Sequence, residues 1–113
     1  MQADDVINIA LERFESSIEE KSRRENLNID PSTEREIEKI VKDALHSKRE
    51  EIKVTIQSQP VDVDQINRAT EELVNSTIDQ AKKERRSNIT SGDAILAFMD
   101  LGIKGCIFPF CKS

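Results

Sequence analysis

The stretch Arg86-Ser87-Asn88-Ile89-Thr90-Ser91-Gly92-Asp93 carries the most specific information in this chain. It joins a long helical pattern, which ends near Arg86, to a short one that opens with Thr90-x-x-Asp93, a capping box. Asp93 lies in the first helical turn, where the helix dipole favours a negative charge. An Arg at the end of one helix and an Asp at the start of the next predict an ion pair that closes the loop. The alternative is an ordinary surface ion pair, worth about 0–1 kcal/mol.

Apolar residues at helical spacing predict four helices, over about residues 5–24, 31–50, 61–86 and 91–101. The third, which follows a capped start at Ser58-Gln59-Pro60, is predicted to be the longest. Between the second and third, residues 52–56 alternate apolar and polar side chains with β-branched residues, which predicts a short half-buried strand. The first and third helices share a weak echo at one offset, interpreted as chance similarity of amphipathic helices. It pairs Ile7-Asn8 with Ile66-Asn67, Ala10 with Ala69, Glu12 with Glu71 and Ser17 with Ser76.

The composition of the 113 residues fits one small all-α domain. Only three Gly and three Pro are present, too few for the turns of a sandwich or barrel, and 35% of the residues are charged. Because only 36% are hydrophobic, the isolated chain is expected to have little core, so a partner chain should cover its apolar stripes. The net charge of −5 argues against indiscriminate nucleic-acid binding but leaves local basic patches open.

The order of a helix, a strand-like loop, a long helix, a second loop and a short capped helix resembles the histone fold. Lys53-Val54-Thr55-Ile56 is similar to the first loop of that family and Asn88-Ile89-Thr90 to the second. The segment 86–93 is similar to the family's Arg-x-Thr-Ile-Thr-x-x-Asp segment, which implies a clamp between Arg86 and Asp93. The resemblance covers about residues 34–101 and is closest to histone-like proteins of the archaeal and bacterial type.

The resemblance implies an all-α histone fold with an additional N-terminal helix. Residues 1–29 would form the extra helix, 30–101 the histone-fold core, and 102–113 an apolar tail that contains Cys106 and Cys111. Two chains would cross in a handshake homodimer, or assemble further into a tetramer, because the flanking helices alone are not expected to cover the central-helix stripe. The predicted dimer interface consists of Ile66, Ala69, Leu73 and Ile78.

The paired loops of such a dimer would contact duplex DNA without sequence preference, through phosphates, as in chromatin organisation or bridging. The predicted DNA-binding residues are Lys53, Thr55, Lys82, Lys83, Arg85, Arg86, Asn88 and Thr90. Ser87 and Asn88 stand where the family usually has Lys and Thr, which puts DNA wrapping in doubt. For the basic run 82–86 alone, cations that complement a helix C-terminus are an equally good interpretation. The alternative function is a histone-fold interaction scaffold with little or no DNA binding.

An enzyme is not expected, since the sequence has no phosphate-binding glycine loop, nucleophile motif or metal-ligand spacing. We therefore predict no catalytic residues, cofactor, metal or small-molecule substrate. The single histidine, His46, is interpreted as a solvated residue. The two cysteines are interpreted as small apolar residues packed in the tail, with half of a shared zinc site as the alternative. No stretch has the length of a membrane span or the start of a secretory signal, so a cytoplasmic location is predicted, on the nucleoid if DNA is bound.

Overall fold

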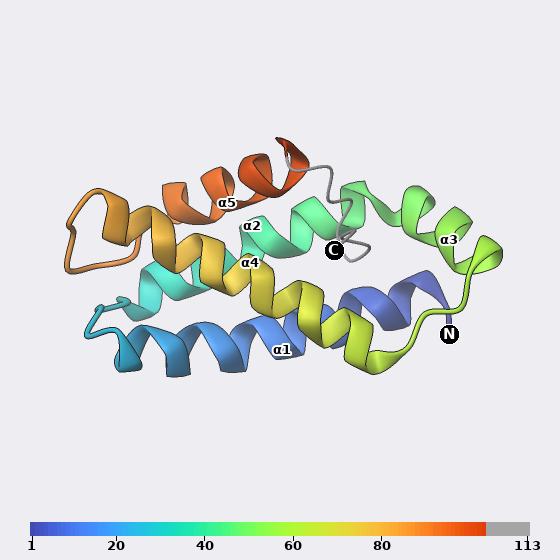
Figure 1. Cartoon of the computed structure of the whole chain (residues 1–113), viewed down its shortest axis with the longest axis horizontal. Helices are drawn as coiled ribbons and strands as arrows, with labels where there is room; N and C mark the ends of the chain where they lie inside the picture. Colours follow the sequence, from blue (N-terminus) through green and yellow to red (C-terminus); the bar gives the residue numbers. More distant parts are fainter. Residues whose placement is uncertain (104–113) are drawn as a thin grey trace.

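Five α-helices make up residues 1–103, the part of the chain that the computed structural model describes (Figure 1). The all-α class predicted from the sequence is therefore confirmed. Of the tail predicted over residues 102–113, residues 102 and 103 belong to the last helix, and 104–113, with Cys106 and Cys111, lie outside the described residues. The helices are α1 (Ala3–Arg24), α2 (Pro31–Ser47), α3 (Arg49–Ser58), α4 (Val63–Lys83) and α5 (Ser91–Ile103).

The helices are arranged as two hairpins, α1–α2 and α4–α5, with α1 packed along α4 (Figure 1). Because α1 and α4 run in the same direction, both hairpins turn at the same end of the molecule. The two loops meet there in a parallel bridge between Asn28 and Asn88. The Asn28 N–H donates to the Ser87 carbonyl at 2.8 Å, and the Ile89 N–H donates to the Asn28 carbonyl at 2.9 Å. Residues 23–32 and 82–92 are together called the paired-loop end.

Both loops leave their helix through the same backbone conformation. Asn26 and Arg85, with φ angles of 57° and 55°, lie in the left-handed region. In each loop the next N–H returns to a carbonyl of the last helical turn, which is the Schellman ending. Asparagine visits this region readily, whereas a residue such as arginine is held there at a cost of roughly 1–2 kcal/mol. The closing bonds run from Leu27 N–H to the Ser22 carbonyl at 2.8 Å and from Arg86 N–H to the Ala81 carbonyl at 3.1 Å.

The two hairpins present matching positions to a shared core. Ile37 and Val41 of α2 are buried, and Ala97 and Leu101 are buried at the corresponding positions of α5. The weak similarity between the first and third predicted helices, interpreted above as chance, falls on equivalent positions of α1 and α4. Its buried pairs are Ile7 and Ile66, Ala10 and Ala69, and Ser17 and Ser76.

The apolar stripe of α4 is buried within the chain itself. Its members, predicted above as a dimer interface, are Ile66 and Leu73 at 0% exposure, Ala69 at 4% and Ile78 at 5%. The stripe therefore needs no second chain to cover it, contrary to the predicted dimer interface, because α1 lies along α4 and adds its own apolar face to the same cluster. Helix α1 is thus one wall of the core of residues 1–103, not an addition beside it.

The strand predicted over residues 52–56 is wrong, since these residues lie inside α3. Ile52 and Ile56 are also four residues apart, so the same alternation places both on one helical face: Ile52 is fully buried and Ile56 half-buried, while Val54 is 62% exposed. A lone strand here would leave its backbone groups unpaired, whereas the helix pairs them. The loop at 88–90 accordingly pairs with Asn28 of the same chain and not with residues 53–56.

Helix α4 is shorter than the 26 residues predicted, at 21 residues, and α1 is the longest helix, with 22. The α4 helix begins after Asp62, whose Oδ1 accepts the Gln65 N–H at 2.8 Å. This N-cap lies beyond the Ser58-Gln59-Pro60 start that the sequence suggested. At its other end α4 stops at Lys83, since the left-handed Arg85 ends the helix before Arg86.

Candidate nucleic-acid interface

The structure divides the predicted DNA-binding residues between the two ends of the molecule. Six of them belong to the paired-loop end, whereas Lys53 and Thr55 lie in α3, toward the opposite end (Figure 1). Thr55 is half-buried and donates its hydroxyl to the Glu51 carbonyl at 2.9 Å, as helical threonines do. Within one chain these two residues do not join the predicted site. The six at the paired-loop end are Lys82, Lys83, Arg85, Arg86, Asn88 and Thr90.

Arg86 and Asp93 form the clamp that the sequence suggested. The Arg86 guanidinium donates to both carboxylate oxygens of Asp93, from Nη1 to Oδ2 at 3.0 Å and from Nη2 to Oδ1. Asp93 is 1% exposed and also accepts the Thr90 N–H at 2.9 Å. Arg86 donates further to Glu84 Oε2 at 2.7 Å and to the Asn88 carbonyl at 3.1 Å. These bonds, those to Asp93 first, raise the pKa of Arg86 above its ordinary value. Arg86 therefore holds the loop, and these bonds already use its donors, so it is a poor candidate for contact with phosphate.

Two exposed cations at this end have no ion-pair partner among the described residues, Lys83 and Arg85. Lys82 pairs with Glu25 at 3.0 Å and so joins the end of α4 to the loop of the first hairpin. Arg23 and Arg24 of α1 are held by carboxylates one helical turn earlier, Glu19 and Glu20. Such exposed pairs are worth about 0–1 kcal/mol and can be exchanged for another anion.

The first hairpin brings residues to this end that the sequence analysis missed. Arg23 and Arg24 lie in the last turn of α1, beside the last turn of α4 with Lys82 and Lys83. The N-termini of α2 and α5 lie at the same end, where the helix dipole favours anions, and each has an acidic residue of the chain in its first turn, Glu34 and Asp93. The signal that could have found this hairpin is Asn28-Ile29-Asp30, which matches Asn88-Ile89-Thr90 in form.

Carboxylates gather along the seam between α1 and α2. Burial, and then repulsion from Glu19 and Glu15, raise the pKa of Glu34 above its ordinary value. Burial together with Glu15 and Glu34 raises the pKa of Glu38 in the same way. The seam is thus a negative surface, and it begins in the first turn of α2, beside the paired-loop end.

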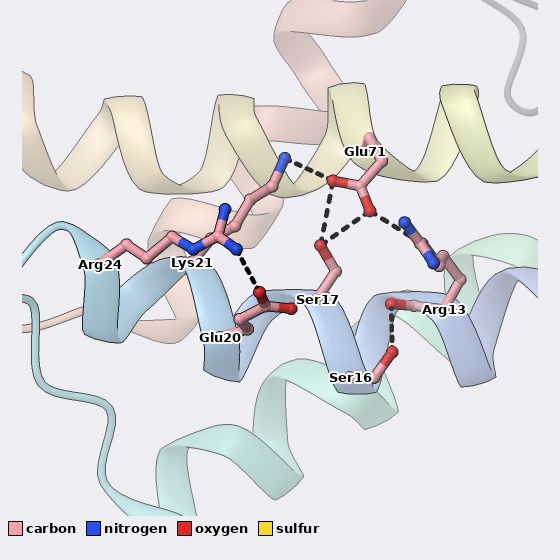
Figure 2. A pocket seen from close by; sticks show the side chains of 7 residues that line it. All are labelled: Arg13, Ser16, Ser17, Glu20, Lys21, Arg24 and Glu71. Atoms are coloured by element: carbon pink, nitrogen blue, oxygen red, sulfur yellow. Dashed lines mark hydrogen bonds and ion pairs between the residues drawn. The ribbon is translucent and has the colours of Figure 1, made fainter.

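A polar groove of about 200 Å³ between α1 and α4 is organised around Glu71 (Figure 2). Glu71 accepts from Arg13 Nε at 2.8 Å, from Ser17 Oγ at 3.0 Å, and from Lys21 Nζ. Burial, the largest single influence, would raise the pKa of Glu71, but the hydrogen bonds from Lys21, Ser17 and Arg13 outweigh it and lower the pKa. Arg13 and Lys21 therefore share one carboxylate, and we interpret this network as a link between the two hairpins.

We expect Glu71→Gln to lower the free energy of unfolding by about 1–2 kcal/mol at neutral pH, because it removes a charged acceptor shared by three donors. A carboxylate whose folded pKa lies below its ordinary 4.5 contributes fully above that value, and the contribution is lost as the pH falls further. The variant should therefore lose less stability than the parent between neutral pH and about pH 3, measured by urea denaturation. The exposed neighbour Glu72→Gln is the control, and an equal effect of both changes would contradict the network's role.

Comparison with known protein families, with curated proteins and with solved structures finds no match to this chain. Among residues 1–103, no group of three or more His, Cys, Asp or Glu side chains is placed to hold a metal ion. In the same residues, no helix has the length and apolar character needed to cross a membrane. The arrangement at the paired-loop end is the feature from which a function can be argued.

Proposed function

We propose that this chain is a histone-like protein that contacts duplex DNA, without sequence preference, through its paired-loop end. The observation that carries the proposal is the parallel packing of α1 and α4 with their loops bridged at Asn28 and Asn88. This packing puts two basic helix ends and two helix N-termini at one end of the molecule. Binding of this kind would serve chromatin organisation or bridging and would place the protein on the nucleoid.

Lys83 and Arg85 are the proposed primary phosphate ligands. Both are exposed and form no ion pair among the described residues, so neither must break one to bind. Arg85 is also held in a left-handed conformation that glycine or asparagine would adopt at lower cost. A functional role of the Arg85 side chain would explain why an arginine occupies this strained position. The exposed amides of Asn28 and Asn88 flank them and can donate to phosphate or sugar oxygens.

The proposed contact is small and electrostatic. Glu25 pairs with Lys82 and Glu84 pairs with Arg86 at this end, and the whole chain has a net charge of −5. We expect roughly two to four phosphates to be neutralised, which corresponds to a slope of about −2 to −4 when log K is plotted against log salt. Binding should therefore be measurable at low ionic strength and weak at physiological salt.

We expect the double variant Lys83→Gln/Arg85→Gln to bind duplex DNA about tenfold more weakly at low salt, and to reduce the salt slope by about two. Electrophoretic retardation over a salt series measures both quantities. The control Lys39→Gln/Lys53→Gln changes the net charge equally at exposed positions of α2 and α3, and should keep the parental slope. Equal weakening by the control, or no retardation of DNA by the parent at low salt, would overturn the proposal.

A protein-interaction scaffold is the second candidate, and a separate observation favours it. Helix α5 exposes Ile95, Leu96 and Met99 side by side, at 48%, 42% and 58%. Exposed apolar residues in contact with one another often mark protein-binding surfaces. If the parent fails to retard DNA while a surface containing these residues binds protein, the scaffold function replaces DNA contact.

A further inference from the structure

The outer face of α5 is apolar although the fold does not require it to be. Its exposed residues Ile95, Leu96 and Met99 correspond to positions 35, 36 and 39 of α2, on the other hairpin. Those positions hold Arg, Glu and Lys, all exposed to solvent. Since the buried positions of the two helices match one another, the hairpin tolerates charge at this face. The apolar character of α5 is therefore explained by a contact made outside the hairpin.

The same face of α5 carries no ionisable group. The two acidic residues of this helix, Asp93 and Asp100, point elsewhere: Asp93 is 1% exposed in the clamp, and Asp100 accepts from Ser76 Oγ of α4 at 3.4 Å. For a chain with a net charge of −5, self-association through most surfaces brings like charges together. The charged groups at the edges of this face have opposite signs: Lys48 Nζ lies 5.8 Å from the centre of the Phe98 ring, and Asp100 follows Leu96 by one turn. Two copies can therefore meet at the outer face of α5 with less repulsion than at most surfaces.

The residues on this face are arranged almost symmetrically along α5. They run Gly92, Ile95, Leu96, Met99 and Gly102, with an exposed glycine at each end and the large side chains between them. At Gly102 an added Cβ would have no atom within 4 Å, and at Gly92 it would only reach the Thr90 hydroxyl at 3.7 Å. Neither glycine is therefore required by packing inside the chain, whereas glycines at a helix–helix contact allow close approach.

We infer that α5 is the interface of a homodimer in which the α5 helices of two copies pack antiparallel about a two-fold axis. In this pairing Ile95 lies opposite Met99 of the second copy, and each Gly92 lies opposite the second copy's Gly102. The two-fold axis passes close to Leu96. A surface that is its own complement is what an isologous dimer needs, and this is why a second copy fits better than an unrelated helix.

The proposed contact spans about 15 Å of helix and is smaller than a standard stable interface, so the dimer should be weak and concentration-dependent. Because α5 begins at the paired-loop end, antiparallel packing would place the two paired-loop ends at opposite ends of the dimer. Such a dimer could bridge two duplexes. That consequence rests on the proposed DNA contact, whereas the dimer itself does not.

Sedimentation of the full chain over a range of concentrations tests the interface. We expect the mass to rise from monomer toward dimer, and Met99→Glu to weaken dimerisation at least about tenfold, because it would bury an unpaired charge. The matched control is Lys39→Gln, at the corresponding exposed position of α2, which changes the net charge by the same one unit and should dimerise like the parent. A chain that stays monomeric at all concentrations, or a dimer that Met99→Glu leaves unchanged, would overturn the inference.

Cross-linking tests the antiparallel geometry separately. In a chain with Cys106→Ser and Cys111→Ser, Leu96→Cys should form a disulfide-linked dimer under mild oxidation, because residues near a two-fold axis face their own copy. Lys39→Cys in the same background should remain monomeric at equal concentration. If Leu96→Cys cross-links no faster than Lys39→Cys, the α5 pairing is incorrect. Retardation of DNA by the Met99→Glu variant shows independently whether the DNA contact holds.

Discussion

Phe14→Ala is expected to lower the free energy of unfolding by about 3–5 kcal/mol, the usual cost of removing a buried phenylalanine. Phe14 is 1% exposed and lies on the face of α1 that joins the shared core with α4. Small domains have a total stability of about 5–15 kcal/mol, so the change should leave the chain marginally folded. Urea denaturation followed by circular dichroism measures it.

The same experiment decides whether α1 is part of the core or an addition to it. If residues 30–101 were an independent unit, Phe14→Ala would leave most of the helical signal and its midpoint unchanged. In the structure, α1 covers the stripe of α4, so both hairpins should lose stability together in one transition. The control is Glu12→Ala, at an exposed position of α1, which should change stability by no more than about 0.5 kcal/mol.

Asp93→Ala is expected to destabilise the chain by about 2–4 kcal/mol. The change removes a buried carboxylate, leaves the Thr90 N–H without its acceptor, and removes the main acceptor of the Arg86 guanidinium. Loss of one partner from a buried hydrogen-bonded ion pair costs far more than loss of an exposed pair. Equilibrium denaturation measures the effect, and Asp79→Ala on the exposed side of α4 is the matched control.

A double-mutant cycle separates the ion pair from the helix cap. Arg86→Ala in the Asp93→Ala background should add little beyond the loss of the Glu84 and Asn88 contacts, because the guanidinium has already lost the carboxylate it held. If Asp93→Ala costs no more than Asp79→Ala, the pair is an ordinary surface ion pair worth about 0–1 kcal/mol. That was the alternative suggested by the sequence.

Helix starts and local ion pairs were predictable wherever the residues that determine them are close together in the sequence. Pro31 and the apolar spacing that follows it place the start of α2, and Thr90 and Asp93 place the start of α5. The Arg86–Asp93 pair was predictable for the same reason, since a short loop leaves the two side chains few other positions. The helix over residues 52–56 was not predictable, because the alternation there fits both a strand and one face of a helix. Only packing against the core selects the helix.

The sequence predicted some of the basic residues that the structure brings to the paired-loop end. The basic residues at the end of α4 were found, since cations concentrated at a helix end are visible in the sequence. Arg23 and Arg24 were not predicted, and Lys53 and Thr55, which were predicted to join the loop of a second chain, lie in α3, away from the paired-loop end of their own chain. The choice between these residues depends on which loop lies beside Asn88. Within the chain that neighbour is Asn28, through a bridge of backbone groups, and the similarity of residues 28–30 to residues 88–90 was its weak signal in the sequence.

The sequence by itself determined the all-α class, most of the helix positions and the clamp. Periodicity, helix capping and an ion pair between residues seven positions apart are local properties of the chain. Only the tertiary structure decided that α1 covers the stripe of α4, since a buried stripe has the same pattern whether it meets its own chain or another. The same packing decided which loops meet and which apolar face remains exposed. That face belongs to α5, at Ile95, Leu96 and Met99, and the proposed second copy would meet the chain there.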